Sequence, residues 1–176
     1  MNFKKLEITG FKSFSEKTNF LIENGLTGIV GPNGCGKSNI VESLRWCMGE
    51  NSAKSMRGSG MEDVIFSGTS NRPSKNISEV TLLLENQDKG GPSQYKDFDE
   101  ISIRRKIEKD KGSKYFINDK EVRARDVQTF FADLSTGAHS PSLISQGKIG
   151  QLVTAKPIER KSILEEAAGI SGIHAR

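Results

Sequence analysis

The segment GPNGCGKS, from Gly31 to Ser38, constrains this chain of 176 residues more than any other stretch. The apolar run LTGIV at 26–30 precedes it and predicts a short strand that is buried on both faces. After Lys37 the apolar residues recur at helical spacing, which predicts a helix that ends near Gly49. A strand, a loop with the spacing G-x-x-x-x-G-K-S and a helix together predict a phosphate-binding loop.

The residue types in this loop suit the phosphates of a nucleotide. Glycines let successive backbone N–H groups face one anion, and the start of the following helix adds unpaired donors. Lys37 is expected to reach the β- and γ-phosphates, and the hydroxyl of Ser38 is expected to bind Mg²⁺. ATP and Mg²⁺ are therefore the expected cofactors. The alternative is a glycine-rich turn that happens to precede Lys and Ser.

Hydrolysis needs a further acidic residue at the end of a second buried strand, where it holds Mg²⁺ and positions water. The nearest candidate is Glu85, which ends the apolar run TLLLE. Polar loops surround that run, and this favours a strand end at the surface. The sequence therefore predicts a chain that binds nucleotide and, by itself, hydrolyses it poorly or not at all.

The remaining pattern predicts an α/β unit in which an antiparallel subsheet packs beside the phosphate-binding loop. Alternating or β-branched runs predict strands at 4–11, 18–22, 77–86, 100–109 and 113–122. The pair Asn118-Asp119 predicts a tight turn. Amphipathic spacing predicts a helix at 124–134, and Pro157 is expected to open another.

Composition sets limits on the class of protein. Hydrophobic residues make up 34% and charged residues 27%, and no apolar run approaches the roughly 20 residues that span a bilayer. Two cysteines form no disulfide framework, so a reducing cytosol is expected. The formal net charge of +4 permits nucleic acid as a partner without requiring it.

Five segments taken together resemble the N-terminal head segment of SMC (structural maintenance of chromosomes) ATPases. In chain order they are GFKSF, GPNGCGKSNIVESLRWCMGE, KSMRGSGMEDVIFSG, ISQGKIGQLV and ERKSILEEAAGI. The resemblance is to the bacterial chromosome-condensation type. It implies an ABC-type P-loop NTPase head lobe over 1–176: a mixed sheet with an antiparallel β-subsheet and helices, and a coiled coil starting near 169–176. We expect the chain to end at a cut rather than at a natural terminus.

The resemblance also implies a set of partners. A C-terminal lobe of the same protein would supply the acidic pair and the signature motif, and two heads would engage on ATP. We expect the protein to form a homodimer through its head and hinge, to bind double-stranded DNA without reading its sequence, and to bind accessory bridging subunits. We expect a cytoplasmic, nucleoid-associated location and no membrane partner. Two alternatives stay open: the head of a coiled-coil DNA-repair ATPase, and the nucleotide-binding subunit of an ABC transporter.

Residue by residue, the resemblance gives catalytic roles to Lys37, Arg57 and Gln146, and places Mg²⁺ on Ser38 and Gln146. Nucleotide contacts are implied for Lys12, Ser13, Phe14, Gly31, Pro32, Asn33, Gly34, Cys35, Gly36, Lys37, Ser38, Asn39 and Asp63. From the residues alone, simpler readings remain. Gln146 and Arg57 are ordinary polar loop residues in this view, Phe14 belongs to the core, and Asp63 caps a turn.

Lys and Arg outnumber Asp and Glu between Ile101 and Arg125. Such a basic segment could bind DNA phosphates without reading sequence, with an affinity that falls steeply as salt rises. The alternative is a solvated sheet edge on which charge prevents aggregation.

Overall fold

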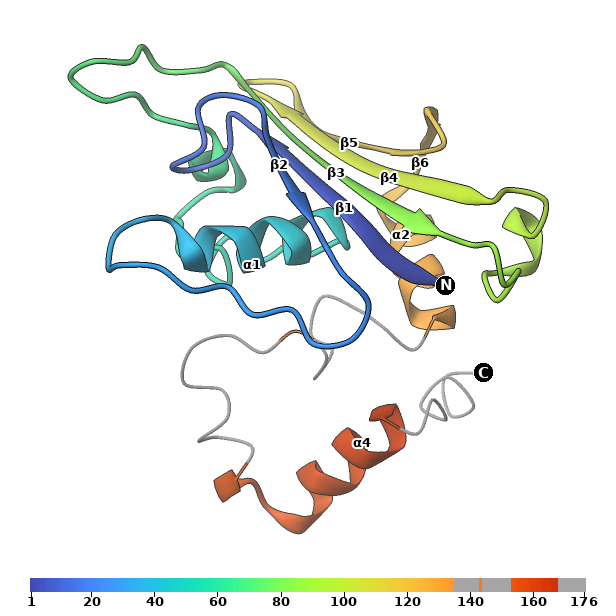
Figure 1. The fold of residues 1–176 in the computed structure, drawn as a ribbon. Helices are drawn as coiled ribbons and strands as arrows, with labels where there is room; N and C mark the ends of the chain where they lie inside the picture. Colours follow the sequence, from blue (N-terminus) through green and yellow to red (C-terminus); the bar gives the residue numbers. More distant parts are fainter. Residues whose placement is uncertain (135–142, 144–152, 168–176) are drawn as a thin grey trace.

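The computed structural model describes residues 1–134, 143 and 153–167 (Figure 1). Its main feature is a six-stranded sheet in the order β2-β1-β3-β4-β5-β6, in which every neighbouring pair is antiparallel. The strands are β1 (Asn2–Thr9), β2 (Thr18–Leu21), β3 (Ile77–Glu85), β4 (Glu100–Glu108), β5 (Gly112–Ile117) and β6 (Lys120–Val122).

Two helices, α1 (Lys37–Cys47) and α2 (Ala124–Asp133), lie on the same face of this sheet (Figure 1). A third helix, α4 (Pro157–Ala167), begins at the proline as the sequence predicts. Short 3₁₀ turns, η1 (Met61–Val64) and η2 (Ser93–Tyr95), occur in the connections. The class is therefore α/β with an antiparallel sheet, in agreement with the sequence analysis.

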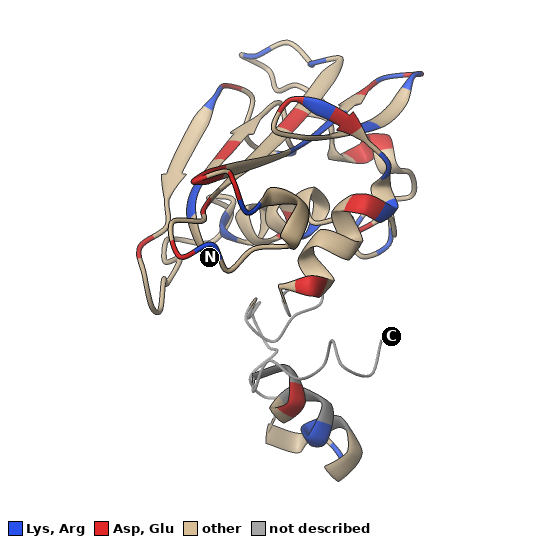
Figure 2. Ribbon diagram, turned by 90° about the vertical axis from the view of Figure 1, so that its right-hand side faces the viewer, with Lys and Arg blue, Asp and Glu red and all other residues tan. Residues whose placement is uncertain are grey.

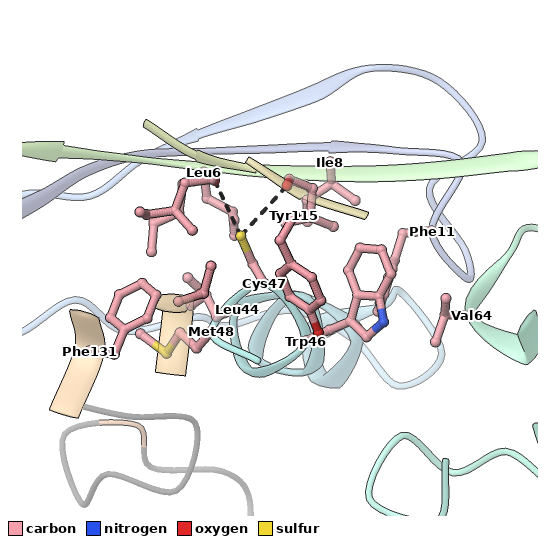
Figure 3. Packing of buried hydrophobic residues seen from close by; sticks show 14 of the residues in the cluster. Leu6, Ile8, Phe11, Leu44, Trp46, Cys47, Met48, Val64, Tyr115 and Phe131 are labelled. Atoms are coloured by element: carbon pink, nitrogen blue, oxygen red, sulfur yellow. Dashed lines mark hydrogen bonds between the residues drawn. The ribbon is translucent and has the colours of Figure 1, made fainter. Parts of the chain in front are cut away.

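The core fills the space between the sheet and α1. Period-2 alternation in β3 and β4 puts one row of side chains on the inner face, including the fully buried Leu82 and Ile103. From α1, Cys47 points toward the sheet, where its Sγ donates to the carbonyl oxygens of Val80 (3.6 Å) and Ile103 (3.3 Å) (Figure 3). Burial raises the pKa of this thiol to about 12.

Arg105 is a charged residue within this core. The alternation of β4 places it on the inner face, where its guanidinium lies between the rings of Trp46 (4.5 Å) and Tyr115 (4.6 Å). It also donates to the carbonyl oxygens of Trp46 (2.8 Å), in the last turn of α1, and of Glu50 (2.6 Å), just after the helix. Desolvation lowers its pKa to about 10, so the residue stays charged at neutral pH and ties β4 to the end of α1.

The predicted buried strand at 26–30 is wrong. This segment has no strand structure, and Leu26 and Val30 are 98% and 92% exposed. A strand needs a hydrogen-bonding neighbour, and both edges of β1 are already taken by β2 and β3. Residues 26–30 pair with none of the described strands, not even with the open edge of β2, and the segment passes outside the sheet between β2 and α1 (Figure 1).

Two other predictions are confirmed. The tight turn at Asn118 and Asp119 exists, with φ values of 47° and 61°, and it separates β5 from β6 within the run predicted as one strand. Glu85 ends β3 at the surface, half-buried and paired in register with Glu100. It lies in the antiparallel sheet, as the pattern of surrounding polar loops indicates.

Candidate nucleotide-binding site

The phosphate-binding loop leads directly into α1. Gly34 and Gly36 have φ values of 81° and 95°, in the left-handed region that side chains rarely adopt. Gly36 is the N-cap residue; no side chain caps the start of α1, and no acidic residue occupies its first turn. The N-terminal N–H groups of the helix are thus available to an anion, as a phosphate site requires.

Lys37 lies across this loop. Its Nζ donates to the carbonyl oxygens of Gly31 (2.5 Å) and Pro32 (2.6 Å) and lies 4.0 Å from the Sγ of the exposed Cys35. An ammonium group held against the carbonyl side of a glycine-rich loop is close to the N–H groups that would receive phosphate. The residues present therefore fit a nucleotide's phosphate chain.

The loop that follows β1 packs against the phosphate-binding loop. Ser13 accepts a hydrogen bond at its Oγ from the side-chain nitrogen of Asn39 (2.9 Å). A Cβ added at Gly36 would come within 2.7 Å of that Oγ and 3.5 Å of Phe14 Cζ. Phe14 is half-buried and packs edge-on against Phe20, so it also belongs to the core. The structure brings Ser13 and Phe14 beside the loop, and the nucleotide contacts that the family resemblance implies for them stay predictions.

Arg57 reaches the same part of α1 from the segment after the helix. Its Nη2 donates to Asn39 Oδ1 (2.7 Å), and its Nε lies 2.5 Å from Glu42 Oε1. Lys12 contacts the other carboxylate oxygen of Glu42 and donates to the carbonyl oxygen of Met56 (2.5 Å). Lys12 is therefore joined to Arg57 through Glu42 rather than directed into the phosphate-binding loop.

Sequence reasoning missed Glu42. It lies in α1 with its side chain 10% exposed, between the two cations. A signal was present, because Glu42 is the one acidic residue of α1 and it falls between the buried positions Ile40 and Leu44. An acid that a helix buries needs a cationic partner, but the pattern of the helix alone does not say which one.

Asp63 has a local structural role. Its Oδ2 accepts hydrogen bonds from the N–H groups of Gly60 (2.9 Å) and Ser59 (2.7 Å) and from the Ser59 hydroxyl (3.0 Å). These bonds, led by the one from Gly60, hold the pKa of the carboxyl below its usual value. The interpretation of Asp63 as the cap of a turn is thus confirmed.

Mg²⁺ has one candidate ligand among the described residues, the exposed hydroxyl of Ser38 in the first turn of α1. Gln146, the other residue expected to bind Mg²⁺ and to act in catalysis, lies outside the described residues. The described part of the chain contains no group of three or more His, Cys, Asp and Glu side chains that could hold a metal ion. A hydroxyl with phosphate oxygens beside it suits Mg²⁺, which prefers oxygen ligands and retains water.

The basic segment is divided between the core and the surface. Arg105 is buried, and Arg104 is engaged by Glu79 (3.4 Å), Asp119 (2.9 Å) and the ring of Phe116 (4.4 Å). Figure 2 shows Lys and Arg interspersed with Asp and Glu over the sheet and its loops. Within the described ranges, five of its cations have no ion pair: Lys106, Lys109, Lys120, Arg123 and Arg125.

The family of the chain follows from its sequence. The family described as "RecF/RecN/SMC N terminal domain" matches residues 2–148. The chain belongs to this family. One curated relative, the chromosome partition protein Smc of Cereibacter sphaeroides, is 57% identical over 176 residues, all of this chain and 15% of the relative.

Solved SMC structures share the fold. The Smc head domain of Pyrococcus furiosus, bound to the C-terminal domain of ScpA, has a TM-score of 0.84 and 32% identity over 99% of this chain and 43% of that one. A second structure, reported as "Structural biochemistry of ATP-driven dimerization and DNA stimulated activation of SMC ATPases", has a TM-score of 0.81 and 32% identity. It covers 95% of this chain and 99% of that chain. The head-lobe fold predicted from the sequence is confirmed.

The chain spans about 15% of the length of this curated relative. The high identity to a chromosome partition protein favours the SMC reading over the transporter alternative. No helix in the described ranges has the length and apolar character needed to cross a membrane.

Proposed function

We propose that this chain is the ATP-binding N-terminal lobe of an SMC ATPase head that serves chromosome condensation and segregation. One observation carries the proposal: a left-handed glycine loop opens onto an uncapped helix start, with Lys37 across it and Arg57 beside it. ATP would lie with its phosphates at this loop, and Mg²⁺ when bound would offset their charge. Lys37 and Ser38 would hold the phosphates and the metal, with Gln146 as a further metal ligand.

Hydrolysis would depend on a C-terminal lobe of the same protein. The two carboxylates described for this site are both engaged, Glu42 by two cations and Asp63 by backbone N–H groups. Neither is available to position an attacking water. The acid needed for ATPase activity would therefore come from the other lobe, and the lobe 1–176 by itself would bind ATP without turning it over.

DNA and protein partners follow from the same assignment. The exposed cations without ion pairs near β6 and α2 suit the phosphates of double-stranded DNA, which they would contact without reading sequence. The solved P. furiosus head with ScpA supports an accessory bridging subunit of that kind. We further propose that the protein forms a homodimer through its head and hinge, that a coiled coil starts near 169–176, and that the protein is located at the nucleoid.

The test is Mg-ATP binding by the complete protein and its K37A variant, measured by calorimetry. Loss of the ammonium removes charge-assisted contacts to phosphate that are worth about 1.5–3 kcal/mol each, so affinity should fall by about 100-fold. Lys54→Ala is the matched control, because Lys54 is an exposed cation near Arg57 whose affinity effect should be negligible. Equal affinities of wild type and K37A would refute the phosphate site.

A turnover assay separates binding from catalysis. The chain 1–176, once shown to be folded and to bind ATP, should release no phosphate, whereas the complete protein should. Phosphate release by the chain alone that disappears in K37A would contradict the proposal that the catalytic acid lies in the C-terminal lobe.

A further inference from the structure

Glu42 lies at the junction of three segments beside the phosphate-binding loop. It is on α1, Lys12 comes from the loop after β1, and Arg57 comes from the segment after α1. The two carboxylate oxygens are divided between the two cations, Oε1 to Arg57 Nε and Oε2 to Lys12 Nζ. The Glu42 and Lys12 side chains are only 10% and 13% exposed, so their contact is shielded from water and is stronger than a surface ion pair, whereas the contact with the more exposed Arg57 is partly screened by solvent.

The contact with Glu42 fixes the direction of the Arg57 guanidinium. Glu42 holds Nε, whereas Nη2 donates to Asn39 Oδ1 at 2.7 Å. Asn39 precedes Glu42 by three residues on the same face of the helix. The guanidinium is therefore anchored at Nε, and its Nη groups are directed toward the N-terminal end of α1, where the phosphate-binding loop lies. The Arg57 side chain as a whole remains 58% exposed.

Lys12 holds the backbone of the arginine segment. Its Nζ donates to the carbonyl oxygen of Met56, the residue before Arg57. Lys12 and Arg57 have φ values of 48° and 54°, a region that residues other than glycine seldom occupy. Glu42 is the group that both cations share. Its carboxylate thus joins two conformationally restricted residues to the helix that begins at the phosphate-binding loop.

We propose that Glu42 is a positioning residue for Arg57: its carboxylate fixes the guanidinium at Nε so that the Nη groups face the phosphates. The proposal rests on the proposed function and on the catalytic role that the family resemblance gives Arg57, which it links to DNA-stimulated turnover; a guanidinium there would stabilise charge that develops on the γ-phosphate. Glu42 itself does not touch the nucleotide. Lys12 acts with it by neutralising the second oxygen and holding Met56, a role that differs from the nucleotide contact implied by the family resemblance.

The experiment compares Glu42→Gln, Arg57→Ala and the double variant in the complete protein. Mg-ATP affinity, and kcat and KM with saturating double-stranded DNA, are measured for each. Loss of orientation should lower the DNA-stimulated kcat of Glu42→Gln by about tenfold or more, with Mg-ATP affinity within about threefold of wild type. The double variant should be no slower than Arg57→Ala, because Glu42 acts only through that arginine.

Glu79→Gln is the matched control, since Glu79 pairs with Arg104 on the other face of the sheet, away from the loop. A kcat for Glu42→Gln equal to that of this control would overturn the proposal, as would additive losses in the double variant. If Arg57→Ala keeps full DNA-stimulated turnover, the positioning role is wrong. The assignment of the phosphate site is tested separately, by the Mg-ATP affinity of K37A.

A second variant tests the same inference should Glu42→Gln fail to fold. Arg57→Lys keeps the positive charge beside Glu42 but has no Nε and no planar fork to orient. It should bind Mg-ATP normally and lose most of the DNA-stimulated kcat. Full stimulation in Arg57→Lys would show that charge alone suffices and would overturn the positioning role.

Discussion

A methyl group added at Gly36 tests whether the left-handed loop is the phosphate site. Gly36 has a φ of 95°, and a Cβ there would come within 2.7 Å of Ser13 Oγ. Gly34 has a φ of 81° with nothing within 4 Å of an added Cβ. Gly34→Ala therefore introduces backbone strain alone, whereas Gly36→Ala introduces the same strain and also displaces Ser13.

The two contributions can be estimated separately. Holding a residue with a side chain in the left-handed region costs roughly 1–2 kcal/mol, which predicts about 5- to 30-fold weaker Mg-ATP binding for Gly34→Ala. Displacing Ser13 also breaks its 2.9 Å hydrogen bond from Asn39. A bond of this kind contributes about 0.5–1.5 kcal/mol, so Gly36→Ala should bind a further 2- to 13-fold more weakly.

The assay is calorimetric titration of Mg-ATP into the complete protein, with melting temperatures to verify folding. In a Ser13→Ala background the hydroxyl is absent, so the additional loss in Gly36→Ala should disappear. Wild-type affinity in Gly36→Ala would refute the assignment of this loop to phosphate. Equal affinities of the two glycine variants would show instead that the contact with Ser13 has no part in binding.

Two further predictions concern the cysteines and DNA. At pH 8 a thiol reagent should modify the exposed Cys35 but not Cys47, because burial raises the pKa of the Cys47 thiol to about 12. Mass spectrometry of labelled peptides measures this, and labelling of Cys47 in the folded protein would contradict its packing in the core. Removing Arg123 and Arg125 together should weaken binding to all DNA sequences and reduce the slope of log affinity against log salt concentration by about 2. The control Lys111→Ala, which removes a cation paired with Glu108, should leave that slope nearly unchanged. A slope that the double change does not alter would exclude Arg123 and Arg125 from the DNA surface.

The sequence by itself determined the features that depend on neighbouring residues. The spacing of GPNGCGKS fixed where α1 begins, because a helix starts where glycines end and helical periodicity sets in. Alternation in β3 and β4 predicted two strands with one buried face. Asn118 and Asp119 predicted a turn because both tolerate positive φ. Each of these signals is contained within a few residues of the chain.

Tertiary structure decided which partners meet. Alternation alone places Arg105 on the inner face of β4, but only the packing of α1 supplies the carbonyl oxygens and rings that make a buried guanidinium stable. Glu42 likewise receives Lys12 and Arg57 from separate segments of the chain. The segment 26–30 reads as a buried strand, yet it has no neighbour among the described strands and stays exposed. Hydrophobicity and periodicity are local properties, whereas burial and ion pairing depend on segments that the chain brings together from a distance.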